Sequence, residues 1–250
     1  MTLEKTKALI LKTFPYRESS LIIYLFTETH GHIHCIVKGI RKQKSRSTLI
    51  ERGQLIEVNV YHRQNRNLLT ASSIHVLEYF PDIRSNIVKY TLRDVAFETI
   101  LTAITQPEMH IELFDFFLKF LFHLNKSPES LCYPFALWLF YYRFTQYMGF
   151  NINMDCCVSC GAHFYKYASL NISRGGLECK SCSEIKTENE SIPESVISYL
   201  LRGKPNPEHI GQSLNPQRIK SITCKMADYC RYHFGIQKEY KSLNFLNDLF

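Results

Sequence analysis

Five cysteines gather in one short segment and form the clearest chemical motif of the sequence. Cys157 and Cys160 make one C-x-x-C pair, Cys179 and Cys182 make a second, and 18 residues separate the two pairs. This spacing is typical of a four-cysteine zinc site, because each C-x-x-C turn can direct two thiolates at the same tetrahedral ion. Four thiolates leave no open position for water, so the sequence predicts one structural zinc ion and not a catalytic one.

Two neighbouring side chains compete for a place in this predicted site. Cys156 precedes the first pair and His163 follows it, and either could replace one of the four cysteines as a ligand. An iron–sulfur cluster is an alternative use of the motif, whereas a thioredoxin-like redox pair would need a βαβ context that the pattern lacks. The chain has nine cysteines, an odd number, and no visible signal peptide, which argues against a disulfide framework.

Basic residues gather near the N-terminus. The formal net charge is +7, and residues 1–80 hold 12 Lys and Arg against 6 Asp and Glu, a local net charge of +6. Such a cluster favours a polyanionic partner, because each neutralised phosphate releases counterions, although a loop that only keeps the protein soluble is the alternative. The candidate residues for binding such a polyanion are Lys38, Arg41, Lys42, Lys44, Arg46 and Arg52, with Arg63 and Arg66 on the next turn. Tyr61 is an aromatic ring on which a base could stack.

No motif for catalysis accompanies these groups. The chain contains no phosphate-binding loop, no H-E-x-x-H pair and no nucleophile elbow. His30, His32 and His34 alternate and would share one face of a strand, but no set of carboxylates supports a reactive site there. The sequence therefore predicts a protein that binds its partners and is not an enzyme.

The N-terminal elements that must position the basic cluster read as strands. Segments rich in β-branched and aromatic residues, separated by turn formers, cover residues 7–14, 20–27, 33–40, 54–62 and 68–79. Five short strands in this length predict a small closed barrel. An OB-fold, which binds oligonucleotides, fits this count, and an SH3-like barrel fits it nearly as well.

From Pro81 onward the apolar spacing is that of helices. Helices are predicted over residues 83–104, 108–124, 130–148, 191–202, 215–233 and 240–249, the fourth with Ser191 as N-cap. The expected architecture is a multidomain α+β protein with an OB-fold domain at 1–80, a helical domain at 81–154, a zinc module at 155–184 and C-terminal helices at 185–250 that pack on the helical domain. No apolar stretch is long enough to span a membrane.

Several segments in this order resemble one family, the bacterial recombination mediator RecO. VKGIRKQKSRS at 37–47 is similar to its K-G-x-R-x-x-x-S signature, and MGFNINMDCCVSCG at 148–161 is similar to its G-F-x-x-x-L-D-x-C-x-x-C-G junction. RYHFGIQKEYKSLNFL at 231–246 resembles its C-terminal signature. The sequence departs from the family at His32 and His34, where members usually have Gly or apolar residues. Met154 also replaces a usual Leu.

The resemblance implies an N-terminal OB-fold, a helical body and a four-cysteine zinc module in a non-enzymatic, cytoplasmic and nucleoid-associated protein. Members bind single- and double-stranded DNA and anneal complementary strands. They also bind RecR and the C-terminal tail of single-strand DNA-binding protein, and so help to load RecA. Some members lack the zinc cysteines, so the metal is not needed for activity across the family.

The aromatic middle segment is the expected docking place for that acidic, apolar tail. Its net charge is near zero, and Arg143 beside Trp138 could pair with a carboxylate of the tail. Two other functions fit the residues without the resemblance. The first is a zinc-ribbon protein that binds RNA or takes part in transcription through protein contacts, and the second is a metal-dependent nuclease.

Overall fold

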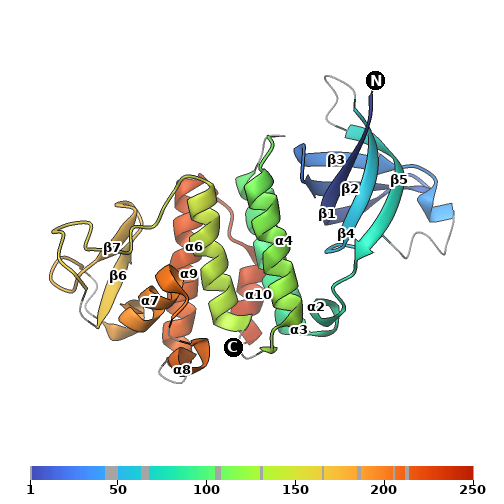
Figure 1. The fold of residues 1–250 in the computed structure, drawn as a ribbon. Coiled ribbons are helices and arrows are strands. Elements are labelled where there is room, and N and C mark those ends of the chain that lie inside the picture. The colour runs from blue at the N-terminus through green and yellow to red at the C-terminus, as the bar shows by residue number, and fades with distance from the viewer. Residues whose placement is uncertain are drawn as a thin grey trace. The chain divides into compact units, whose positions relative to one another are not determined.

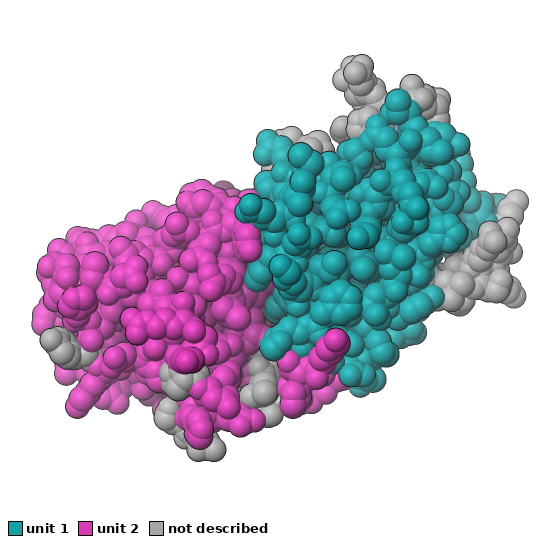
Figure 2. Space-filling view, viewed as in Figure 1, with its two compact units in different colours: residues 1–85, 100–125 teal, residues 86–99, 126–250 magenta. Residues whose placement is uncertain are grey.

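The computed structural model describes residues 2–42, 50–62, 68–104, 108–129, 132–164, 166–184, 187–204, 206–211 and 214–249. The chain divides into two compact units (Figure 2). Unit 1 comprises residues 1–85 and 100–125, and unit 2 comprises residues 86–99 and 126–250. Helix α3 (Ile87–Ala103) crosses the boundary between these two sets of residues.

Unit 1 contains a closed five-stranded barrel (Figure 1). The order around the barrel is β1-β2-β3-β5-β4, and every neighbouring pair is antiparallel except β3 and β5, which are parallel. The predicted small closed barrel is therefore confirmed. Its strands are β1 (Thr2–Tyr16), β2 (Ser20–Thr27), β3 (Gly31–Val37), β4 (Leu55–His62) and β5 (Leu68–Glu78).

Strand β1 closes the barrel because it is long enough to pair on both sides. Residues 2–9 pair with β4, and residues 8–16 pair with β2. A register shift between Ile10 and Lys12 bends the strand from one neighbour toward the other. The apolar pattern predicted only residues 7–14, since the polar first residues carry no hydrophobic signal and become a strand through their pairing with β4.

Side chains alternate between the barrel interior and its outer face. Ile10, Ile23 and Cys35 are fully buried in the interior cluster. On the outer face, Phe26 packs against Phe114 and Phe117 of helix α4 (Ile111–Lys126), with ring centroids 5.7 and 6.2 Å away. Part of the phenylalanine-rich helix thus covers one end of the β1–β3 face.

Unit 2 combines helices with a small sheet of order β7-β6-β8. Helix α6 (Leu137–Tyr147) packs against α9 (Pro216–His233), and the Trp138 indole N–H donates a hydrogen bond of 2.8 Å to Thr223 Oγ1. Its elements are η2 (Cys132–Ala136), α6 (Leu137–Tyr147), β6 (Tyr167–Asn171), β7 (Gly176–Glu178), η3 (Glu188–Glu190), β8 (Ile192–Pro193), α7 (Glu194–Arg202), α8 (Pro207–Gly211), α9 (Pro216–His233) and α10 (Lys241–Leu249).

The single helix predicted over 130–148 is divided in the structure into η2, in which Tyr133 has non-helical backbone angles, and α6. Two further helix predictions also differ from the structure. The helix expected over 83–104 is divided into α2 (Pro81–Ser85) and α3, because Asn86 Oδ1 accepts the N–H of Lys89 and starts a new helix. Ser191 is not the N-cap of α7. Pro193 occupies that position, and the Ser191 hydroxyl donates to the Glu188 carbonyl at 2.8 Å. None of the described helices is long and apolar enough to cross a membrane.

Candidate metal centre and nucleic-acid interface

The two C-x-x-C pairs are held together by a β-hairpin. Strands β6 and β7 pair antiparallel in the segment between the cysteine pairs. The first pair lies against β7 because the Val158 N–H donates to the Leu177 carbonyl at 2.9 Å. Gly176 permits this approach, since a Cβ there would lie 2.5 Å from Val158 Cγ1.

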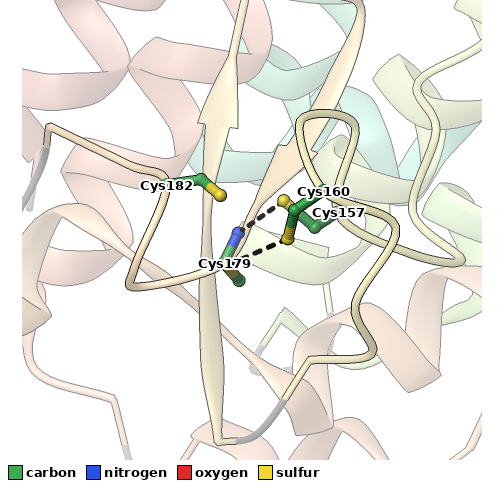
Figure 3. A group of neighbouring side chains, drawn as sticks. All are labelled: Cys157, Cys160, Cys179 and Cys182. Carbon is green, nitrogen blue, oxygen red and sulfur yellow. Dashed lines mark hydrogen bonds between the residues drawn. The ribbon is translucent and has the colours of Figure 1, made fainter.

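The four predicted ligands converge in the structure. The Sγ atoms of Cys157, Cys160, Cys179 and Cys182 all lie within 4.8 Å of one another (Figure 3). Cys160 Sγ and Cys179 Sγ are 3.8 Å apart, and the Cys179 N–H donates to Cys157 Sγ at 3.3 Å. Tetrahedral thiolates at about 2.3 Å from one ion would be separated by about 3.8 Å, so the donor set fits a metal ion. Cys156 and His163 do not belong to this group of described side chains.

Hydrogen bonds and neighbouring thiols give the cysteines of the cluster different pKa values. Burial raises the pKa of Cys157, but backbone N–H groups of Cys179, Ser159 and Cys160 outweigh burial and lower it to about 6. Hydrogen bonding to the Cys160 and Cys179 thiols raises the pKa of Cys182 to about 12. Cys157 therefore loses its proton readily, whereas its neighbours resist the deprotonation of Cys182. A divalent cation would remove that resistance, because its charge offsets the repulsion between thiolates.

A polar network clamps the first cysteine turn to the hairpin. The Ser159 hydroxyl donates to Glu178 Oε1 at 2.6 Å, and Arg174 Nη1 donates to Ser159 Oγ at 2.8 Å. The Ser159 hydrogen bond lowers the pKa of Glu178, so this carboxylate is charged and can attract Arg174, whose Nε lies 3.8 Å away. Such outer contacts hold ligand turns in position around a metal ion.

The candidates from Lys38 to Arg52 form the basic segment. Among its described side chains, those of Lys38 and Arg41 are exposed. Arg41 lies in the short turn η1 (Ile40–Lys42) and is fixed to the β1–β2 turn. Its backbone N–H donates to the Ser19 carbonyl at 2.9 Å, and its guanidinium donates to the Arg17 carbonyl at 3.0 Å. The start of the basic segment therefore sits at one defined end of the barrel.

The remaining candidates are described only in part. Arg52 is partly buried in the turn before β4, and Lys42 is described by its backbone in η1. Lys44, Arg46, Arg63 and Arg66 lie outside the described residues.

Trp138 is a core residue and offers no surface to a peptide. Its side chain is 0% exposed, and its ring packs against Phe135 with centroids 5.5 Å apart. This burial corrects the expectation that Trp138 contacts a docked tail. Arg143 is partly exposed, donates to Gln146 Oε1 at 2.9 Å and lies 5.5 Å from the ring centroid of Tyr142.

The sequence reasoning did not find two surface features. The first is a pocket of about 390 Å³ in unit 2, lined by Tyr133, Pro134, Pro216, Gln217, Ile219, Lys220 and Asn247. The second is a row of rings on the outer face of β1–β3. The period of two in β2 was the available signal, because it places Tyr24 on the face opposite the buried Ile23.

Comparisons with known proteins cover nearly the whole chain. The family model "Recombination protein O N terminal" matches residues 1–80, and "Recombination protein O C terminal" matches residues 84–241. The gap between the two matches lies where the last barrel strand gives way to helices.

Curated relatives agree with the family models and have similar lengths. A protein of Caldanaerobacter subterraneus named DNA repair protein RecO is 27% identical over 96% of both chains. Proteins with the same name are 28% identical in Clostridium novyi, over 100% of this chain and 95% of the relative, and 31% identical in Prosthecochloris aestuarii, over 92% of each.

Proposed function

Because the chain belongs to the RecO family of DNA repair proteins, we propose that it acts as a non-enzymatic recombination mediator. It binds single- and double-stranded DNA and anneals complementary strands. Together with RecR it helps to load RecA onto DNA coated by single-strand DNA-binding protein. The barrel is of the OB type, which its five strands and their β1-β2-β3-β5-β4 order support.

The basic turn at the end of the barrel is the observation that carries the DNA-binding part. Lys38 and Arg41 are exposed, and two hydrogen bonds to the β1–β2 turn hold Arg41 in place. Such a fixed cation contacts phosphates without reading base sequence. Lys42, Lys44, Arg46 and Arg52 follow in the sequence and extend the positive charge along the same segment.

Annealing follows from the same chemistry. Two complementary strands repel each other through their phosphates, and a basic surface lowers that repulsion. Because backbone contacts leave the base edges free, a bound strand can pair with its complement. Neither step makes or breaks a covalent bond, so no catalytic residue is needed.

A charge-reversal series tests this function. Changing Arg41, Lys42, Lys44 and Arg46 to Glu should abolish most oligonucleotide binding and annealing, and should flatten the dependence of log K on log salt. The matched control changes four exposed lysines elsewhere, Lys119, Lys204, Lys238 and Lys241, to Glu, with the same change in net charge. If both quadruple variants lose binding equally, only net charge matters. If the first binds like the parent, the basic segment is a solvated loop.

The four-cysteine cluster holds one structural zinc ion. The converging thiols, their separation and the clamp of Ser159, Glu178 and Arg174 support this assignment. With four thiolates the coordination shell is complete, so the ion stabilises the fold and supplies no reactive water.

The tail of single-strand DNA-binding protein docks at the unit 2 pocket. This pocket has an apolar wall that includes Tyr133, Pro134, Pro216 and Ile219. Lys220 also lines it, is exposed and can pair with an acidic residue of the tail. Fluorescence anisotropy with a labelled tail peptide should show weaker binding to Lys220→Glu than to the control Lys238→Glu. Binding lost instead in Arg143→Glu would place the tail beside α6.

RecR is the partner that joins this protein in loading RecA. Mixing the two proteins and measuring their co-elution tests the interaction directly. RecA filament assembly on coated DNA should then require both proteins, and filament assembly that is equally fast without this chain would contradict the mediator role.

A further inference from the structure

Three rings from three strands form a row on the outer face of the barrel. Tyr24 on β2 stacks on His34 of β3, with ring centroids 3.8 Å apart and planes 21° from parallel. Tyr24 also makes an edge contact with Phe14 on β1, with ring centroids 5.2 Å apart. Tyr24 and His34 are direct partners in the strand register, so the backbone itself sets this stack.

The row lies beyond the part of this face that helix α4 covers. Phe26, two residues along β2 from Tyr24, is fully buried against α4. Phe14, Tyr24 and His34 are each partly exposed. Because strand residues two apart share a face, the sheet presents these rings outward while its neighbouring residues fill the core.

Cations flank the rings. Lys12 Nζ lies 4.6 Å from the centroid of Phe14, and the Arg17 guanidinium lies 5.3 Å from the centroid of Tyr16. Arg41 is hydrogen-bonded to the Arg17 carbonyl, so the basic segment begins beside this edge. Glu18 is an exposed acidic residue in the β1–β2 turn. Rings interleaved with cations match the alternating bases and phosphates of an unpaired strand.

We propose that Phe14, Tyr24 and His34 stack against the bases of single-stranded DNA while Lys12 and Arg17 contact its phosphates. This inference deepens the proposed function and rests on it. Stacking occupies the faces of the bases and leaves their hydrogen-bonding edges open. A strand held on the row can therefore pair with a complementary strand.

The row also distinguishes single strands from duplex. Bases of a duplex are stacked on one another, so only its phosphates reach the cations, whereas the bases of a single strand are free to stack on protein rings. Affinity for single strands depends on the rings, and affinity for duplex does not.

Substitution of the rings by leucine tests the proposal. The double variant Phe14→Leu/Tyr24→Leu keeps apolar side chains on the sheet but removes two stacking surfaces. The dissociation constant for a single-stranded oligonucleotide should rise about 5- to 150-fold, the equivalent of about 1–3 kcal/mol for one stacked base. The duplex dissociation constant and the salt dependence of both should stay as in the parent, because the phosphate contacts remain.

A tyrosine outside the barrel provides the matched control. Tyr90 on α3 is 37% exposed and has the Arg93 guanidinium 3.9 Å from its ring centroid, so Tyr90→Leu removes a similar ring beside a cation. This variant should bind single strands like the parent. An equal loss in Tyr90→Leu and in the double variant would overturn the assignment to the row.

A second readout reports stacking itself. The fluorescence of 2-aminopurine in a single strand is quenched by stacking, so it should fall on binding to the parent and fall less with either Phe14→Leu or Tyr24→Leu. These single variants carry the test if circular dichroism shows the double variant unfolded. The proposal would be contradicted if the folded variants kept the single-strand affinity and the quenching of the parent. If the parent binds no DNA at all, the proposed function fails instead.

Discussion

His32 and His34 lie next to each other on β3, with ring centroids 4.9 Å apart. Desolvation by burial and the neighbouring His34 lower the pKa of His32 to about 4, against a hydrogen bond to the Ile104 backbone that raises it. Burial also lowers the pKa of His34. Among the described residues neither Nε2 has a hydrogen-bond partner that could stabilise a charged ring. Both rings are therefore neutral at pH 7.

This environment predicts an acid-sensitive fold. In the unfolded chain His32 has its ordinary pKa near ~6.5 and takes up a proton there, whereas the folded protein resists protonation down to about 4. The stabilising contribution is complete above about pH 6.5 and is lost as the pH falls toward 4. Thermal melts should show a drop in Tm between pH 7 and pH 4.5 that is smaller in His32→Gln. Equal drops in both proteins would mean that the His32 proton is not linked to folding.

The cysteine cluster makes a second prediction at the residue scale. Cys157→Ser/Cys179→Ser should contain no zinc, since two of four ligands are lost from a site whose Sγ atoms lie within 4.8 Å of one another. Elemental analysis of the purified protein measures this directly. Cys156→Ser is the control and should retain one zinc ion per chain, because Cys156 is not in the converging group. Zinc absent from the parent, or present in the double variant, would refute the assignment.

At the scale of elements, the packing of α6 against α9 predicts that Trp138 stabilises the fold and does not bind a partner. Trp138→Phe loses buried volume and the hydrogen bond to Thr223, so the free energy of unfolding should fall by about 1–3 kcal/mol in denaturant titrations. Binding of the tail peptide should not change in the folded variant. If binding is lost while the variant remains folded, the tryptophan belongs to the docking surface after all.

At the scale of the whole molecule, we predict that the proposed zinc ion stabilises the fold and takes no part in the proposed strand annealing. A chelator that strips a thiolate site should lower the Tm by about 5 °C or more, since each kcal/mol shifts the Tm of a chain this long by about 2–4 °C. Annealing rates should be unchanged at temperatures where circular dichroism shows the stripped protein folded. Annealing that is lost from a folded, stripped sample and restored by zinc would require a direct role for the ion.

Local patterns in the sequence determined much of the architecture. The spacing of the cysteine pairs predicted the four side chains that converge, and the apolar runs predicted strand 20–27 and helix 215–233 close to their observed ends. These features depend on neighbours within a few residues, because C-x-x-C turns, alternating strands and helical spacing are local.

Only the tertiary structure decided which side chains reach the surface and which meet across strands. Trp138 has the residue type of a docking site, yet its place between packed helices buries it. No sequence pattern groups Phe14, Tyr24 and His34, and they form a row because the register of β1, β2 and β3 brings them together. Helix α4 buries one end of that face and leaves the rings of the row partly exposed. Contacts of this kind join residues ten or more positions apart, so they depend on strand register and helix packing, which no local pattern contains.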